Sequence, residues 1–86
     1  MEMSSVPRIA PGCRLHPTED ILLVPEGTLN LSGPSRQILS RLDGKLDLNA
    51  IVTDLVTEFD GADAEEVRQD VLGFLDRLQQ RGVVRI

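Results

Sequence analysis

The 86-residue sequence predicts an α+β domain of winged-helix type, in which short N-terminal antiparallel β-strands precede a three-helix bundle. Three observations lead to this class. Apolar residues recur at helical spacing in three segments of the C-terminal half and the region just before it. Ahead of them, two short runs rich in apolar residues flank Pro25-Glu26-Gly27, a sequence typical of a hairpin turn. Only two aromatic residues are present, Phe59 and Phe74, so the core must be aliphatic.

Residues 1–12 are rich in Ser, Pro and Gly and poor in apolar side chains, which is typical of a flexible N-terminal arm outside the core. Residues 13–86 are then expected to form one domain. Within it, residues 13–16 are predicted to be a short strand. Residues 17–20 contain a proline and an aspartate, which favour a turn.

A β-hairpin is expected next. Residues 21–24 form an apolar, partly β-branched run that is too short for a helix. Pro25 suits the second position of a type I turn, and Gly27 permits the left-handed conformation that closes a three-residue loop. Residues 28–31 alternate in polarity, which places two pairs of side chains on opposite faces of the strand: Thr28 with Asn30, and Leu29 with Leu31.

The first predicted helix follows Ser32. The side chain of Ser32 is expected to cap the helix N-terminus, and Pro34 is tolerated in the first turn because no intrahelical donor is lost there. Gly44 is expected to end the helix as a left-handed C-terminal cap. Its buried stripe is predicted to consist of Ile38, Leu39 and Leu42.

Two longer amphipathic helices complete the expected fold. The second helix is predicted to begin at an N-cap, Asp47, and to bury Leu48, Ile51, Val52, Leu55, Val56 and Phe59. The third is predicted to begin with a capping box, in which the side chain of Glu66 reaches back to the amide of Asp63, and to end at Gly82. Its apolar side carries Val67, Val71, Phe74, Leu75 and Leu78. Residues 83–86 are expected as a terminal strand or a frayed end.

Charge and composition narrow the function. The formal net charge is −5, so the chain repels phosphate backbones at long range, and nucleic acid is not expected as a partner. No apolar run approaches the ~20 residues that span a bilayer, and the N-terminus lacks signal-peptide features, so no membrane partner and a cytoplasmic location are expected. The single cysteine and single histidine, Cys13 and His16, predict no intramolecular disulfide, metal site or catalytic triad.

Other functions fit parts of the sequence. A winged-helix DNA-binding regulator would read DNA with its third helix, but Arg68, Arg77 and Arg81 alternate with acidic residues and form no basic stripe. An acyl-carrier-like protein would carry its prosthetic group on a serine within Asp-Ser-Leu, which the sequence lacks. An open strand edge and an N-terminal arm also permit a homodimer by strand exchange.

A peptide-binding groove is expected beside the second hairpin strand. A sheet of two or three short strands leaves an edge open, and residues 28–31 contain no proline or lysine that would blunt it. On the third helix, Leu72 lies about 140° round from Val67, at the shoulder of the apolar stripe, flanked by Arg68 and Gln79. An open strand edge next to an apolar helix shoulder accepts an extended peptide as an added strand.

The order and spacing of these motifs resemble the PqqD family of pyrroloquinoline quinone (PQQ) biosynthesis and the wider class of RiPP precursor-peptide recognition elements. The resemblance runs from about Arg14 to Val84, and its most specific parts are Pro25-Glu26-Gly27, Leu31, Ile38-Leu39 and Asp43-Gly44. Two stretches depart from the family pattern. Val24 stands where an aromatic residue often precedes the Pro-Glu pair. Leu31-Ser32 and then Ser35 stand where relatives commonly have Leu-Asn followed later by alanine, although Ser32 keeps the N-cap role.

The resemblance implies a non-enzymatic peptide chaperone without a cofactor. Members of the family bind the ribosomal precursor peptide PqqA and present it to PqqE, a radical SAM enzyme that cross-links a Glu and a Tyr within the peptide. In recognition elements the leader peptide docks as an added strand against the third strand, beside the third helix. Residues 13–86 would thus be a single peptide-recognition domain whose binding residues are Thr28, Leu29, Asn30, Leu31, Arg68, Leu72, Leu75 and Gln79.

Overall fold

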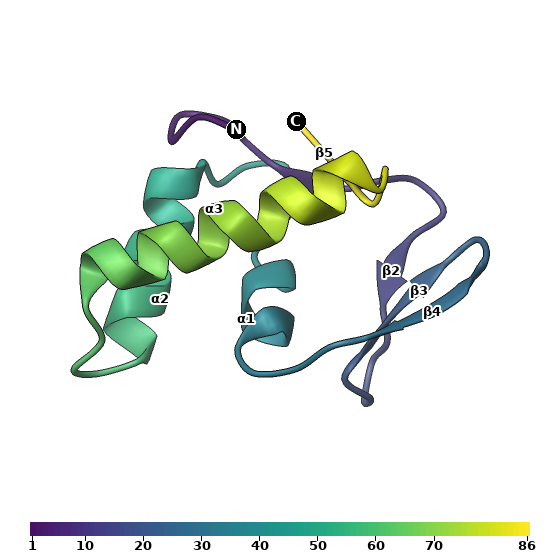
Figure 1. The fold of residues 1–86 in the computed structure, drawn as a ribbon, viewed down its shortest axis with the longest axis horizontal. Helices are drawn as coiled ribbons and strands as arrows, with labels where there is room; N and C mark the ends of the chain where they lie inside the picture. The colour runs from purple at the N-terminus through teal and green to yellow at the C-terminus, as the bar shows by residue number, and fades with distance from the viewer.

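A computed structural model describes all 86 residues of the chain. Four short strands come first, three helices follow, and a fifth strand ends the chain (Figure 1). This order confirms the predicted α+β class with antiparallel strands ahead of three helices, whereas the likeness to a winged helix stays a prediction. The elements are β1 (Arg8–Ile9), β2 (Arg14–Leu15), β3 (Ile21–Val24), β4 (Gly27–Asn30), α1 (Ser35–Leu39), α2 (Leu48–Glu58), α3 (Ala64–Gln80) and β5 (Val84–Arg85).

The strands form two sheets rather than the single small sheet that the sequence predicts. β2, β3 and β4 make a three-stranded antiparallel sheet in that order, so β4 lies at one edge. Leu22 of β3 lies opposite Leu29 of β4, and Val24 lies opposite Gly27. The hairpin loop therefore has two residues instead of the predicted three, because Gly27 pairs within the strand, and Leu31 lies just beyond its end.

The N-terminal segment packs against the rest of the chain, in contrast to the predicted arm outside the core. β1 pairs with β5, which makes the C-terminal segment a strand, and Figure 1 shows both termini on the same side of the molecule. Pro7 and Ala10 are buried, and the N–H of Leu48 donates to the carbonyl of Ser5 at 3.0 Å. Local composition missed this packing because every partner lies far away along the chain. The mobility of residues 1–12 stays a prediction.

Helix α1 is shorter than predicted and is capped differently. It begins at Ser35, with Pro34 at the N-cap position and no side-chain cap. The carbonyl of Ser32, not its side chain, takes part here, accepting a hydrogen bond from the Ser35 hydroxyl at 2.7 Å. The helix ends at Leu39, and Gly44 takes a φ of 77° in the turn that follows instead of capping the helix. The predicted stripe is confirmed as buried: Ile38, Leu39 and Leu42.

Helices α2 and α3 begin at the predicted aspartate caps. Oδ1 of Asp47 accepts from the N–H of Ala50 at 2.8 Å. Oδ1 of Asp63 accepts from the N–H groups of Glu65 and Glu66 at 2.9 and 3.1 Å. The predicted capping box is half formed. The Asp63 side chain accepts its hydrogen bonds, but the Glu66 side chain accepts none from the N–H of Asp63. Local sequence thus fixes where both helices start.

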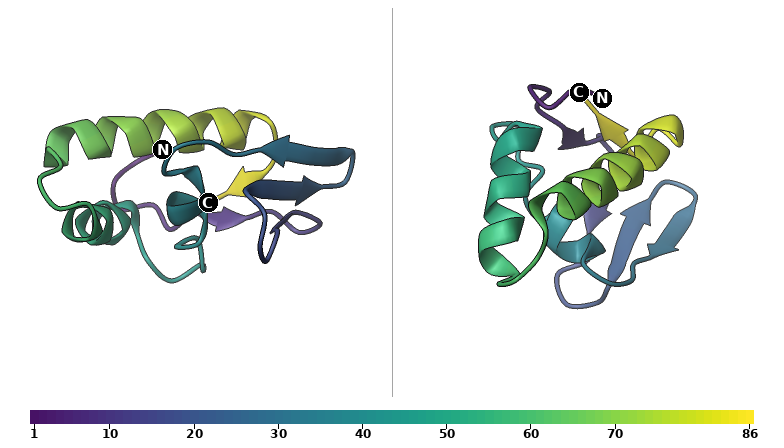
Figure 2. Two further views of the ribbon diagram at one scale, coloured as in Figure 1. Left: turned by 90° about the horizontal axis from the view of Figure 1, so that it is seen from below. Right: turned by 60° about the vertical axis from the view of Figure 1, so that its left-hand side comes forward.

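Aliphatic side chains form one core beneath α3. Figures 1 and 2 show α3 running over α1, from α2 at one end of the molecule to the three-stranded sheet at the other. Leu22 is the member of that sheet in the buried cluster, and it is fully buried together with Leu48, Ile51 and Leu75. No polar or charged residue is buried, so burial of apolar surface holds the fold together.

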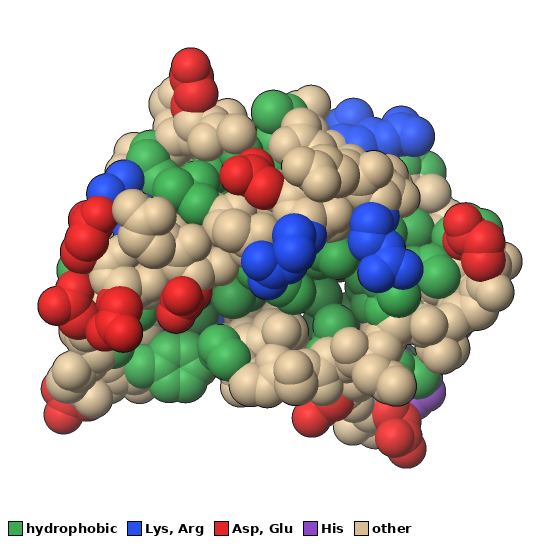
Figure 3. All heavy atoms as spheres, in the orientation of Figure 1, with side chains coloured by type: hydrophobic (Ala, Val, Ile, Leu, Met, Phe, Trp, Pro, Cys, Tyr) green, Lys and Arg blue, Asp and Glu red, His purple; other side chains and the backbone are tan.

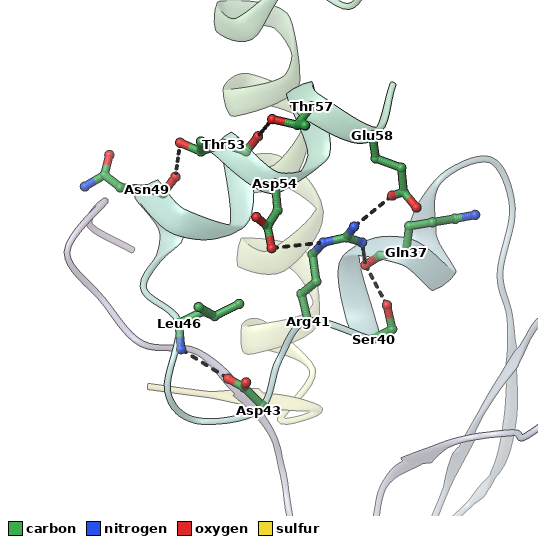
Figure 4. Close-up of polar contacts among 10 residues, drawn as sticks. All are labelled: Gln37, Ser40, Arg41, Asp43, Leu46, Asn49, Thr53, Asp54, Thr57 and Glu58. Carbon is green, nitrogen blue, oxygen red and sulfur yellow. Dashed lines mark hydrogen bonds and ion pairs between the residues drawn. The ribbon is translucent and has the colours of Figure 1, made fainter. Parts of the chain in front are cut away.

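Arg41 fastens the end of α1 to α2 (Figure 4). Its guanidinium donates to Oε2 of Glu58 at 2.8 Å and lies 3.8 Å from Oδ2 of Asp54, both on α2. It also donates to the carbonyl of Gln37 in α1 at 2.8 Å. These contacts hold the C-terminal end of α1 against α2.

Candidate functional site

The edge of β4 offers unpaired backbone groups. The N–H of Leu31 donates to the carbonyl of Asp20 at 2.9 Å, which sets the phase of the β3–β4 ladder. In an antiparallel pair, every second residue turns its N–H and C=O toward the partner strand. Leu29 therefore bonds inward to β3, whereas the N–H and C=O of Thr28 and Asn30 point outward, away from the sheet.

The β2–β3 ladder agrees with this phase. The N–H of His16 donates to the carbonyl of Ile21 at 3.0 Å, so Ile21 and Leu23 bond toward β2. Leu22 and Val24 must then bond toward β4, as the β3–β4 register requires. Two independent hydrogen bonds thus give the same outward direction for the free groups of β4.

A groove lies between this edge and α3. A hollow of about 330 Å³ lies between them, and Figure 2 shows β4 as the strand of its hairpin nearer to α3. A second hollow of about 270 Å³ continues along α3 past Gly73 toward Asp70. We call the two hollows together the β4–α3 groove. Its residues beside β4 are Leu29, Asn30, Leu31, Phe74, Arg77, Leu78 and Arg81, and Gly73 and Asp70 lie at its far end.

The groove has an apolar floor and a basic rim. Leu29 and Leu31 line it from the hairpin, and Phe74 and Leu78 line it from α3. Figure 3 shows hydrophobic side chains around the hollow with basic side chains beside it. None of the ion pairs in the structure uses the two arginines of the groove, Arg77 and Arg81. The groove therefore carries two cationic side chains without an ion-pair partner, in a chain whose net charge is −5.

The structure brings only part of the predicted site together. Leu29, Asn30 and Leu31 line the groove, whereas Thr28 lines the neighbouring hollow beneath the hairpin loop. Leu75 is fully buried in the core and is 0% exposed. Arg68 lies near the start of α3 and forms an ion pair with Glu65 on the same helix. Neither Leu72 nor Gln79 lines any of the hollows beside β4.

Leu72 does not line the groove because it lies on the flank of α3 that faces away from the sheet. At 100° per residue, Phe74 and Arg77 lie on one side of the buried stripe and Leu72 lies on the other. Asp76 marks that other flank, where its carboxylate accepts from the amino group of Met1 at 3.3 Å. The apolar stripe of α3 has two margins. The site expected from sequence, with Arg68, Leu72, Leu75 and Gln79, used the margin beside the N-terminal segment, whereas the margin with Phe74 and Arg77 faces the sheet.

Other titratable groups have structural explanations. Nδ1 of His16 accepts from the N–H groups of Thr18 and Glu19 at 3.1 and 3.0 Å, which closes the turn between β2 and β3. No group of three or more His, Cys, Asp or Glu residues is placed to hold a metal ion. None of the helices has the length and apolar character needed to cross a membrane.

The shifted pKa values also lie away from the groove. The side-chain hydrogen bond from Arg68 lowers the pKa of Glu65, and the same bond raises the pKa of Arg68. Backbone N–H groups of Lys45 and then Leu46 lower the pKa of Asp43. Each shift follows from a local surface contact, so none of them points to proton transfer in the groove.

An open strand edge beside a hydrophobic, basic helix flank defines a class of protein: a small α+β domain suited to accept an extended peptide. The chain belongs to the PqqD family. The family model described as "Coenzyme PQQ synthesis protein D (PqqD)" matches residues 19–84, which confirms the resemblance found in the sequence.

Curated relatives and a solved structure agree with this family. The "PqqA binding protein" of Pseudomonas putida (strain W619) is 35% identical over 79 residues, covering 87% of this chain and 85% of the relative. Its counterpart in Xanthomonas oryzae pv. oryzae (strain KACC10331 / KXO85) is 35% identical over 86 residues, covering 95% and 92%. The solution NMR structure of the PqqD truncation of Methylobacterium extorquens PqqCD, described as a functional and stand-alone RiPP recognition element, is 30% identical with a TM-score of 0.84, covering 100% of this chain and 95% of that one.

Proposed function

We propose that this chain is a non-enzymatic adaptor of PQQ biosynthesis that binds the precursor peptide PqqA by β-strand addition. The observation that carries this proposal is the outward direction of the N–H and C=O groups of Thr28 and Asn30 at the edge of β4. The names of the relatives support PqqA as the peptide. The added strand would lie between β4 and α3, over the apolar floor of the groove.

Backbone pairing and burial would supply the affinity. Thr28 and Asn30 each offer one donor and one acceptor, and each hydrogen bond contributes a net ~0.5–1.5 kcal/mol. Side chains of the peptide that face inward would cover Leu29, Phe74 and Leu78, which adds about 25 cal/mol per Å² of apolar surface removed from water. The backbone bonds give affinity, and the shape and charge of the groove give specificity.

The adaptor would act by presenting the bound peptide to PqqE. Holding PqqA on a domain that also contacts the enzyme raises the effective concentration of the peptide at the enzyme, without any chemistry in the domain itself. We propose that this presentation takes place in the cytoplasm, where ribosomal peptides are made. The rate of PqqE-catalysed cross-linking of PqqA, with and without this chain, tests the presentation step.

A homodimer by strand exchange would use the same edge of β4, so it would compete with the peptide. Light scattering with and without PqqA tests this. If a dimer forms, added PqqA should convert it to a monomer–peptide complex. A dimer that persists with bound PqqA would show that the two do not share the edge.

The binding residues that we propose are residues 28–31 together with the groove residues of α3, in place of the four α3 residues expected from sequence. A matched pair of variants, Phe74→Glu and Leu72→Glu, tests the choice of flank by calorimetry with PqqA. Both side chains are half-buried and both variants add one negative charge. Phe74→Glu should weaken binding by more than ~1 kcal/mol, because it places a charge in an apolar groove, whereas Leu72→Glu should not. The reverse order would return the site to the other flank.

A further inference from the structure

Two arginines stand at the junctions of the hollows along α3. Arg77 lines both the hollow beside β4 and the one that continues past Gly73, and Arg81 lines the hollow beside β4 and the one beneath the hairpin loop. A Cβ built on Gly73 would lie 3.6 Å from Nη1 of Arg77, so that guanidinium lies along the helix surface within the groove. Neither arginine forms an ion pair.

The helix dipole favours basic residues near the C-terminal end of a helix, whichever face they lie on. That effect accounts for the presence of arginines near the C-terminus of α3 and leaves their common direction unexplained. Arg77 and Arg81 are four residues apart, so both project from the flank that faces β4. An unpaired guanidinium beside an apolar floor is a ready partner for a carboxylate, with which it forms two parallel hydrogen bonds.

The spacing of the two arginines matches an extended strand. Residues four apart in an α-helix are separated by about 6 Å along the axis, since each residue rises about 1.5 Å. Residues two apart in a β-strand are separated by about 6.6 Å and point to the same face. A strand added to β4 would thus present two side chains, two residues apart, at the spacing of Arg77 and Arg81. Asp70, at the far end of the groove, would repel a carboxylate placed there.

We propose, building on the function proposed above, that the groove recognises an acidic–x–acidic segment of its peptide, in which two carboxylates two residues apart both face α3 and bind Arg77 and Arg81. The rest of the inward-facing side chains cover the apolar floor. Recognition therefore reads the spacing of the acidic residues as well as their number.

Two blocked synthetic peptides of identical composition test this. Both are valine- and threonine-rich to favour an extended chain, and both contain two glutamates. In the first peptide the glutamates are two residues apart; in the second they are three apart, which turns one carboxylate to the opposite face. Fluorescence anisotropy should show the first peptide binding about three- to tenfold more tightly, the range expected when one charge-assisted contact is lost. Equal affinities, or no binding of either peptide, would overturn the inference.

Variants of the chain identify the groups that read the spacing. Arg77→Gln and Arg81→Gln should each weaken the first peptide about three- to tenfold and remove its advantage over the second. Arg8→Gln is the control, because it removes the same charge from an exposed residue of β1 that lines none of the hollows. If all three variants weaken binding equally, net charge and not the groove is responsible, and the inference fails.

Titration of PqqA into the unaltered chain separates this inference from the proposed function. If PqqA binds and the two synthetic peptides show no difference, the adaptor role stands and the spacing rule falls. If PqqA does not bind while the first peptide keeps its advantage, the groove reads acidic spacing but serves a different peptide.

Discussion

Replacing Asn30 by proline tests the direction of one backbone N–H group. This N–H points away from β3 and the side chain is exposed, so the fold uses neither. Proline removes the donor and leaves the matching carbonyl of the added strand without its partner. Loss of the hydrogen bond together with the unpaired acceptor should cost binding about 1–3 kcal/mol, which is about a 5- to 150-fold weaker complex. Proline is tolerated at a strand edge, so the free energy of unfolding should change by less than about 1 kcal/mol.

Calorimetry with PqqA measures the binding term, and urea denaturation of the same samples measures the folding term. Asn30→Ala is the matched control, since it removes the side chain and keeps the N–H; it should bind PqqA as the unaltered chain does. Wild-type affinity in Asn30→Pro would refute the reasoning. Equal losses in both variants would assign the effect to the side chain.

Three further changes test the helices and a surface turn. Gly73→Ala should raise the free energy of unfolding by about 0.5–1 kcal/mol, because alanine favours the helix more than glycine does and the new methyl group fits at an ordinary 3.6 Å from Nη1 of Arg77; a lower urea midpoint would contradict this. The same methyl group should weaken PqqA binding by narrowing the groove. Asp63→Ala should cost about 1 kcal/mol through loss of the α3 cap, whereas Asp60→Ala, with no hydrogen bond to lose, should be near neutral in the same denaturation. Asp43 has a pKa below its ordinary 3.8, so its contribution to stability is present above that pH and is lost as the pH falls through the lower folded-state pKa. In urea melts, the stability difference between the unaltered chain and Asp43→Asn should therefore shrink between about pH 6 and about pH 3. A stability difference that does not depend on pH would contradict this.

The sequence predicted those parts of the fold that depend on residues close together in the chain. The caps Asp47 and Asp63 and most of the apolar stripes lie within single helices, and the structure confirms them. Phe59 is the exception, because α2 ends at Glu58 and leaves its side chain exposed. The pairing of β1 with β5 joins opposite ends of the chain, and each strand has two residues, so no local pattern marks it. The turn at Gly27 shows a smaller failure of the same kind. Turn residues predicted a hairpin, but its loop length depends on the register with β3.

The site divides in the same way. The open edge at residues 28–31 followed from strand count and polarity, both of which are readable in the sequence. The direction of each N–H depends on the phase of the ladder, which only the pairing of Leu31 with Asp20 reveals. Helical periodicity places Leu72 and Phe74 at opposite margins of the apolar stripe of α3, and it does not tell which margin lines a groove. Tertiary packing, which no single helix encodes, turns Phe74 toward β4.

Peptide binding at this site requires the backbone of β4 to accept a new strand, and amide hydrogen exchange of residues 27–31 measures this directly. In the free chain, the amide of Leu29 should exchange slowly because it bonds to β3, and the amides of Thr28 and Asn30 should exchange fast. With saturating PqqA, Thr28 and Asn30 should become protected while Leu29 stays as it was. If PqqA binds and those two outward amides keep exchanging as fast as before, strand addition at this edge is wrong.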